Sequence, residues 1–213
     1  MKIDKIYVIN LGKSFDDITE RINELQIPVG IEYHVWPAVN GNQLVSGEIT
    51  KPYSWKQASS WKIQSDNEWW NRDMLPGEIG CMLSHYEVWM DVAKNGYENV
   101  LVLEEDFKVQ NPFPNQELAS LPEAWDFVYL GKNNVADNPD TRINDHVSVP
   151  GYSYNTHAYL LSNAGAKKLL STDVANNLVP ADEFIPSVIG VHPRKDLLDL
   201  FKVESFKGYT FNK

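Results

Sequence analysis

The 213 residues have the composition of an ordinary globular protein, with 43% hydrophobic and 23% charged side chains. The 29 acidic residues outnumber the 19 basic ones. The formal charge of -10 therefore argues against nucleic acid or anionic lipid as a partner and favours a divalent cation or a basic peptide. The length fits a single domain over residues 1–213, and no apolar run approaches the roughly 20 residues of a membrane span.

The N-terminal sequence MKIDKIYVINLGK is not expected to be a signal peptide, because its apolar run of about six residues is short and flanked by charges. Cys81 is the only cysteine, so the chain cannot form an internal disulfide. A cytoplasmic location fits both features, and so does a domain cut out of a larger protein of the secretory pathway.

The first forty residues predict a strand, a helix and a second strand. Residues 5–11 are short, β-branched and apolar, which is typical of a buried strand. Residues 14–25 have helical spacing of apolar side chains, and Ser14 and Asp17 have the spacing of a capping box. Residues 31–38 alternate in polarity. This order begins an open α/β sheet.

Residues 40–76 are polar, weakly periodic and rich in tryptophan. Tryptophan supplies a flat apolar face with one hydrogen-bond donor, which suits a sugar or a protein interface, and ordinary core packing is the alternative. At least one of these side chains is expected to line an acceptor groove or to contact the second subunit of a homodimer. The set comprises Trp55, Trp61, Trp69 and Trp70.

Residues 77–96 predict a long helix that ends at Asn95 and Gly96. His85 is interpreted as a hydrogen-bonded core histidine, with a ligand as the alternative, and Cys81 as a small buried residue. The apolar face predicted for this helix comprises Ile79, Met82, Leu83, Tyr86, Met90 and Ala93.

The second half of the chain predicts three more strands and two helices. A polar excursion is expected at residues 132–152. A helix capped by Ser162 follows the last of these strands, and another helix begins after Pro180. The strands are expected at residues 99–106, 125–131 and 156–162.

Glu104, Glu105 and Asp106 stand together at the end of a predicted buried strand. If the strand continues unbroken, Glu104 and Asp106 point to one side and Glu105 to the other. Ligands of open α/β sheets bind beyond the carboxyl ends of the strands, where two converging carboxylates need a cation such as Mn²⁺ or Mg²⁺. The alternatives are a solvated acidic turn and a paired-carboxylate hydrolase, for which adjacent residues on one strand are poorly placed.

Seven segments resemble glycosyltransferase family 25, which includes bacterial lipooligosaccharide galactosyltransferases and animal procollagen galactosyltransferases. They occur in the family's order: IYVINL, WPAVNG, GEIGCMLSHYEVW, VLVLEEDF, WDFVYLG, AYLLSNAGAKKLL and VPADEFIP. The last two segments are more similar to the procollagen branch. The resemblance implies an α/β fold with a Rossmann-like mixed sheet of the GT-A type flanked by helices. It also implies one catalytic domain and Mn²⁺-dependent transfer from a UDP-sugar.

The resemblance also implies roles for individual residues. Glu104 and Asp106 are expected to hold Mn²⁺, or Mg²⁺, against the donor diphosphate. Asp182 or Glu183 is expected to act on the acceptor as the catalytic carboxylate. The residues expected around the UDP-sugar are Asn10, Leu11, Ala38, Val39, Gly41, Ser84, His85 and Glu105.

Three features depart from the family's pattern. The middle acid of the triplet is usually Asp, and here it is Glu105. The stretch after the first strand is often rich in arginine, and here it offers Lys13 and Arg21 for a diphosphate. The last thirteen residues lack the histidine ligand usual near the C-terminal end, so water, His192 or residues outside this chain would complete the metal shell.

The expected function is transfer of galactose or glucose from a UDP-sugar to a hydroxyl group. The favoured acceptor is hydroxylysine or galactosyl-hydroxylysine of a collagen-like chain. One alternative is a transferase that acts on lipopolysaccharide or another glycan. The other is a non-catalytic sugar-binding or scaffolding domain, because a fold does not guarantee an activity.

Overall fold

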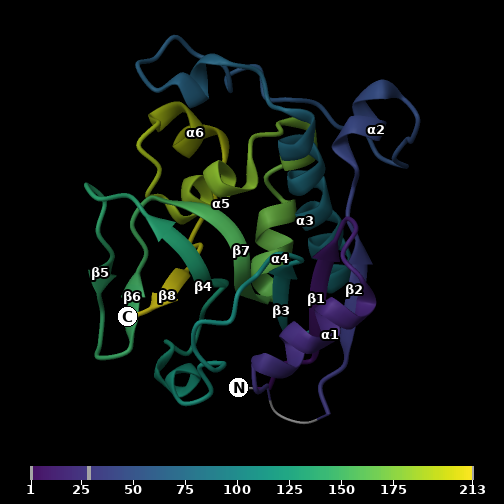
Figure 1. The fold of residues 1–213 in the computed structure, drawn as a ribbon. Helices are drawn as coiled ribbons and strands as arrows, with labels where there is room; N and C mark the ends of the chain where they lie inside the picture. The colour runs from purple at the N-terminus through teal and green to yellow at the C-terminus, as the bar shows by residue number, and fades with distance from the viewer. Residues whose placement is uncertain (1, 28–29, 213) are drawn as a thin grey trace.

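Within residues 2–27 and 30–212, which the computed structural model describes, eight strands form one sheet in the order β2-β1-β3-β7-β4-β8-β6-β5 (Figure 1). The strands are β1 (Lys5–Asn10), β2 (Tyr33–Pro37), β3 (Asn99–Glu104), β4 (Phe127–Asn134), β5 (Thr141–Arg142), β6 (Val147–Val149), β7 (Ser153–Ser162) and β8 (Gly208–Phe211). The α-helices are α1 (Phe15–Glu24), α2 (Gly41–Ser46), α3 (Pro76–Asn95), α4 (Asn163–Leu170), α5 (Ala181–Ile189) and α6 (Lys195–Leu200). The 3₁₀ helices are η1 (Glu68–Asn71), η2 (Glu117–Ser120) and η3 (Val174–Asn176).

The sheet is mixed. β1 pairs in parallel with β2 and β3, β7 runs antiparallel between β3 and β4, and β8 is parallel to β4. The short strands β6 and β5 extend the edge beyond β8. This architecture confirms the α/β, Rossmann-like mixed sheet with flanking helices that was predicted, and it is consistent with the GT-A type. Among the described residues, no helix is both long enough and apolar enough to cross a membrane.

Alternation along β3 divides its side chains between two cores. Val100 and Val102 pack in the cluster that contains α3, α4 and α5, whereas Leu101 and Leu103 pack in the cluster on the other face, with α1. Glu104 continues the first series, so its side chain is directed toward α3. The buried strand thus determines where the first acid of the triplet points.

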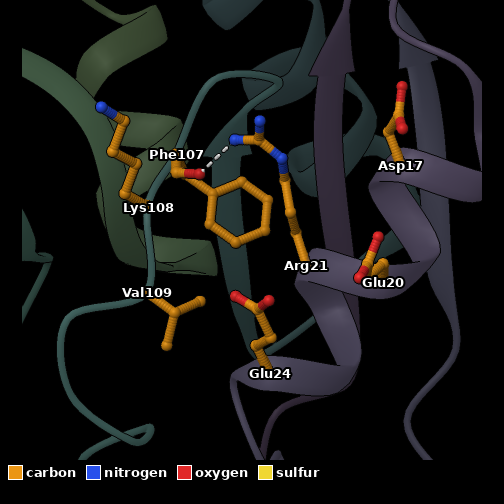
Figure 2. Close-up of a pocket in the computed structure, with 7 residues that line it drawn as sticks. All are labelled: Asp17, Glu20, Arg21, Glu24, Phe107, Lys108 and Val109. Atoms are coloured by element: carbon orange, nitrogen blue, oxygen red, sulfur yellow. Dashed lines mark hydrogen bonds between the residues drawn. The ribbon is translucent and has the colours of Figure 1, made fainter.

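Helix α1 begins as predicted, because the side chain of Ser14 accepts a hydrogen bond from the backbone nitrogen of Asp17 at 3.2 Å. Figure 2 shows the pocket between α1 and the segment that follows the acidic triplet. There, Arg21 Nη1 donates to the carbonyl oxygen of Phe107 at 2.6 Å. In this structure Arg21 therefore anchors the chain beyond the triplet.

Two glycines allow α2 and α3 to approach each other closely. A Cβ on Gly41 would lie 1.6 Å from the carbonyl oxygen of Pro76, and a Cβ on Gly80 would lie 2.4 Å from the carbonyl oxygen of Val39. Ser84 fixes the same contact, because its hydroxyl accepts from the Val39 nitrogen at 2.8 Å. Gly41 of WPAVNG and Gly80 of GEIGC are therefore explained by backbone packing.

Helix α3 is buried on more sides than the single apolar face predicted for it. Trp89 and Val92, which lie outside that face, are fully buried, whereas Tyr86 and Met90 remain partly exposed. The helix packs against the sheet and also contacts α2, α4 and α5, so a single apolar face could not describe it.

The tryptophan-rich segment between α2 and α3 passes across the top of the molecule in Figure 1, above α5 and α6. Trp61 is fully buried there, and its carbonyl oxygen accepts from Arg194 Nη1 at 2.7 Å. Trp55 and Trp70 are partly buried against the core, but Trp69 is 43% exposed. Most of the group is therefore core, and Trp69 differs from the rest.

Several predicted boundaries were wrong. The strand expected to include all three acids ends at Glu104. The excursion expected at 132–152 contains the end of β4 and the strands β5 and β6. Neither α6 nor β8 was predicted, because each is short and follows no strong periodic pattern.

Candidate active site

A cleft of about 1410 Å³ lies beyond the carboxyl end of β3. Its walls come from α3, β4, β7, the start of α5 and the segment after β3. Three of the predicted site residues line it: Glu104, Asp106 and Asp182. This position agrees with the general location of ligand sites in open α/β sheets.

Glu104 is held by two side chains of α3. Its Oε1 lies 2.9 Å from His85 Nε2 and accepts a hydrogen bond from Cys81 Sγ at 3.4 Å. Burial raises the pKa of Glu104, but the contacts with His85 and Cys81 outweigh burial, so the pKa lies below its usual value. The carboxylate is consequently charged at neutral pH.

The acidic triplet does not follow strand alternation beyond Glu104. The chain turns there, and the Phe107 nitrogen donates to the Glu104 carbonyl oxygen at 3.1 Å. Asp106 is exposed and lines the cleft, whereas Glu105 does not line it. The two acids share the cleft as expected, but a turn brings them there and a continuous strand does not.

Glu105 binds the loop after β1. Its Oε2 accepts hydrogen bonds from the backbone nitrogens of Leu11, Gly12 and Lys13 at 2.8, 3.0 and 3.2 Å. Burial raises the pKa of Glu105, but these backbone bonds outweigh it and the pKa is lowered. In this structure Glu105 therefore fixes the loop and does not face the cleft.

The other residues expected around a UDP-sugar lie at the ends of β1 and β2, at the start of α2 or in α3. The Asn10 side chain accepts from the backbone nitrogens of Gly12 and Lys13. Ser84 and His85 are fully buried beneath the cleft. In the part of the chain that the structure describes, none of these seven predicted residues lines the cleft. They are Asn10, Leu11, Ala38, Val39, Gly41, Ser84 and His85.

Asp182 lies in the first turn of α5, after Pro180, and lines the cleft. The backbone nitrogen of Asn155 donates to its Oδ2 over 3.4 Å. Burial, followed by the neighbouring charge of Glu183, raises the pKa of Asp182 to about 6. A carboxylate with this pKa is ionised at pH 7 and is still basic enough to accept a proton.

Glu183 is not placed for a role in the cleft. Its side chain is fully buried, both of its oxygens lie 3.0 Å from Tyr152 Oη, and one is bonded to His192 Nε2. The other ring nitrogen of His192 accepts from the Arg194 backbone at 2.9 Å. This arrangement corrects two expectations, because Glu183 does not reach the cleft and neither nitrogen of His192 is free for a metal.

His157 lines the cleft but was missed at the level of sequence. Leu103 of β3 pairs with Ala158 of antiparallel β7. The next pair in this register is Glu104 and His157, whose side chains therefore lie on the same face of the sheet. A Cβ on Gly131 would lie 2.2 Å from His157 Nε2, so the bare glycine leaves room for the ring. Among the described residues, the ring makes no hydrogen bond. Strand register was the signal that could have identified it.

Cys81 lines the cleft and is only partly buried, contrary to the expected buried position. Its sulfur, one His85 nitrogen and one Glu104 oxygen lie within 4.8 Å of one another. These three side chains form a compact group: Cys81 and Glu104 line the cleft, and His85 is buried behind them.

Comparison with known proteins identifies the family. The model of glycosyltransferase family 25 (LPS biosynthesis protein) matches residues 3–147. This chain belongs to glycosyltransferase family 25. The matched residues include α3 and the acidic triplet, and they end before β7 and α5.

Curated family 25 relatives cover nearly the whole chain. A glycosyltransferase 25 family member of Aedes aegypti is 32% identical over 217 residues, which are 99% of this chain and 35% of the relative. Procollagen galactosyltransferase 1-B of Xenopus laevis is 29% identical over 221 residues, covering 99% of this chain and 35% of the relative. The inactive glycosyltransferase 25 family member 3 of Homo sapiens is 31% identical over 211 residues, covering 90% of this chain and 33% of the relative. The chain thus spans about a third of the length of the curated relatives it matches.

The family 25 cleft has donors suited to a hard divalent cation. Glu104 Oε2 has no hydrogen-bond partner among the described residues, and the carboxylate of Asp106 has none either. Both line the cleft, and carboxylate oxygens are the ligands that Mn²⁺ and Mg²⁺ prefer. The residues present therefore fit the cation that the sequence resemblance implies.

Proposed function

We propose that this family 25 chain is a metal-dependent glycosyltransferase that moves a hexose, galactose or glucose, from a UDP-sugar to a hydroxyl group. One observation carries this proposal: Glu104, Asp106 and Asp182 line one cleft and have different environments. Glu104 has a lowered pKa, and Asp182 has a pKa raised to about 6. Such a division is typical of a site where one carboxylate holds charge and another moves a proton.

On the donor side, Glu104 and Asp106 would hold Mn²⁺ or Mg²⁺. When bound, the cation would stabilise the negative charge that develops on the departing UDP. His157 lies opposite Glu104 with an unpaired ring in the described structure, so we assign it, in place of His192, as the histidine available to the cation or the diphosphate.

On the acceptor side, Asp182 would take the proton of the attacking hydroxyl. General-base catalysis of this kind contributes roughly 10²–10⁴-fold, and it works best when the pKa of the base lies near the working pH. The backbone nitrogen of Asn155 orients the carboxylate. Glu183 supports α5 from within the core.

The acceptor that we propose is hydroxylysine or galactosyl-hydroxylysine in a collagen-like chain. The name of the Xenopus relative supports this choice, and the formal charge of -10 would attract a basic peptide. A lipopolysaccharide or other glycan acceptor is the second candidate, supported by the description of the family model. The human relative, named as inactive, motivates a non-catalytic role as the third.

A UDP-release assay with a panel of UDP-sugars tests the proposal. We expect release with one UDP-hexose only when Mn²⁺ or Mg²⁺ is present, loss of release in EDTA, and recovery when Mn²⁺ is restored. A hydroxylysine peptide and a lipooligosaccharide acceptor would then distinguish the two catalytic candidates. Absence of UDP release and of sugar transfer with every donor and acceptor would leave the non-catalytic candidate.

A further inference from the structure

A line of hydrogen bonds runs from the core to the cleft through four side chains. Trp89 Nε1 lies 2.9 Å from Tyr159 Oη, and Tyr159 Oη lies 2.9 Å from His85 Nδ1. His85 Nε2 lies 2.9 Å from Glu104 Oε1. The first three side chains are fully buried, and only Glu104 reaches the cleft.

The indole of Trp89 fixes the direction of every bond in this line. An indole N–H can only donate, so the hydroxyl oxygen of Tyr159 accepts from it. The hydroxyl proton of Tyr159 is then donated to His85 Nδ1, and neutral His85 carries its own proton on Nε2. That proton is donated to Glu104, so each buried polar atom has a partner.

The opposite direction leaves a buried donor without an acceptor. If His85 Nδ1 carried a proton, Tyr159 would receive two donors, and its hydroxyl proton would have no acceptor among the described residues. The same objection applies to a doubly protonated His85. An unsatisfied buried donor is costly, so the direction from Trp89 to Glu104 is favoured.

The line uses one oxygen of Glu104 and leaves the other available. Oε1 accepts from both His85 and Cys81, which holds this oxygen against α3. We propose that His85 is a positioning residue: held in one tautomer by Tyr159 and Trp89, it orients Glu104 so that Oε2 faces the cation of the donor site. This inference rests on the proposed function and replaces the expected contact of His85 with the donor.

A zinc site is the competing interpretation of the same residues. Cys81, His85 and Glu104 have ligand atoms within 4.8 Å of one another, and these residue types bind Zn²⁺. However, the bond direction places a proton on His85 Nε2, where a metal needs a lone pair. The polarity of the line therefore favours positioning over zinc ligation.

Direct Mn²⁺ binding without any UDP-sugar tests the inference, for example by electron paramagnetic resonance of free Mn²⁺ during titration. We expect His85→Ala to weaken binding at least about tenfold, because loss of a group that orients a metal ligand typically costs 10–100-fold. His85→Gln places an N–H donor near the position of Nε2 and should recover most of the affinity. Tyr159→Phe should weaken binding less than His85→Ala does, because the Nε2 donor remains.

His192→Ala is the matched control for His85→Ala. His192 is also buried and hydrogen-bonded to a glutamate, but it lies outside the cleft lining. This variant should lower Tm about as much as His85→Ala does, yet leave the Mn²⁺ affinity unchanged. An equal loss of Mn²⁺ affinity in both variants would reduce His85 to a general structural role and overturn the inference.

The outcomes separate this inference from the proposed function. A wild-type chain that binds no Mn²⁺ would contradict the metal dependence itself. If the wild type binds and folded His85→Ala binds equally well, the proposed function stands and the positioning role is wrong. Stoichiometric Zn²⁺ binding that is lost in both Cys81→Ser and His85→Ala would assign the group as zinc ligands instead.

Discussion

The carboxylate of Glu105 accepts a hydrogen bond from the backbone nitrogen of Leu11 at 2.8 Å, across the ends of the neighbouring strands β3 and β1. This contact divides the acidic triplet into three roles. Glu104 is held by α3, Glu105 fixes the loop after β1, and Asp106 is exposed in the cleft. Two of the three carboxylates therefore line the cleft, whereas the backbone N–H groups after β1 hold the third.

Replacement of Asp106 should abolish metal-dependent transfer and leave the fold intact. Asp106→Ala removes an exposed carboxylate with no hydrogen-bond partner among the described residues, so Tm should stay near the wild-type value. The proposed cation site would lose one of its few oxygen ligands, and UDP release should fall at least about a hundredfold.

The control for this prediction is Asp137→Ala, which removes an exposed acid outside the cleft lining. It should leave both UDP release and Tm unchanged. Wild-type activity in Asp106→Ala would exclude Asp106 as a ligand.

Replacement of Glu105 should affect stability more than replacement of Asp106. A carboxylate that accepts backbone hydrogen bonds stabilises the fold, and partial exposure reduces the effect to about 1 kcal/mol. Glu105→Gln should therefore lower the free energy of unfolding by about that amount. Glu204→Gln changes an exposed side chain elsewhere and should leave the free energy of unfolding unchanged.

The stabilisation by Glu105 should depend on pH. Because the folded-state pKa lies below the ordinary value of 4.5, the carboxylate stabilises the fold above about pH 4.5. This contribution is lost as pH falls through the lower folded-state pKa. The difference in Tm between wild type and Glu105→Gln should therefore be full at pH 6 and should shrink as the pH falls below 4.5. A difference that does not vary with pH would exclude the charge as its cause.

Strand alternation explains the environment of Glu104 but not that of Asp106. Val100 and Val102 pack beneath α3, so the next side chain in the series meets α3 as well. The chain then turns, and alternation carries no information about residues in a turn. Asp106 reaches the cleft because of this turn, and the pattern of apolar residues could not predict the turn.

The difference between Asp182 and Glu183 could not be predicted locally. Both acids suit the first turn of a helix, and both benefit from its dipole. Their separation depends on Tyr152 and His192, which are distant in sequence and enclose Glu183. The position of His157 was hidden for a similar reason, because it depends on the pairing of β7 with β3.

Trp69 should contribute to acceptor binding and Trp61 to stability. The guanidinium carbon of Arg72 lies 4.2 Å from the centroid of the Trp69 ring. Nη1 and Nη2 of Arg72 donate to the two carboxylate oxygens of Glu78 at 2.9 and 2.6 Å. Trp69 also lines the cleft. Trp69 therefore gives the cleft a rigid aromatic surface that suits a sugar or a peptide.

The two tryptophans provide a matched pair of variants. Trp69→Ala should raise the KM for the acceptor several-fold and change Tm little. Trp61→Ala should lower the free energy of unfolding by about 3–5 kcal/mol, because it removes a fully buried aromatic side chain. Thermal melts and acceptor kinetics measure both effects, and a large loss of Tm in Trp69→Ala would assign that side chain to the core.

Replacement of Asp182 should separate activity from stability. Asp182→Asn keeps the size and hydrogen-bonding oxygen of the side chain but removes the base, so kcat for transfer should fall roughly 10²–10⁴-fold with UDP-sugar binding unchanged. In the wild type, kcat/KM should fall as pH drops below about 6, where Asp182 becomes protonated. This limb of the pH profile should be absent in the variant.

The sign of the stability effect follows from the raised pKa of Asp182. The folded state binds this proton more tightly than the unfolded state, so the favourable contribution is complete below about pH 4 and is lost as pH rises through about 6. At pH 7 the charged carboxylate therefore destabilises the fold, by about 2–3 kcal/mol from the size of the shift. Asp182→Asn should match the wild-type Tm near pH 4 and equal or exceed it at pH 7. If the variant instead loses Tm and kcat together at pH 7, Asp182 is a helix cap and the base lies elsewhere.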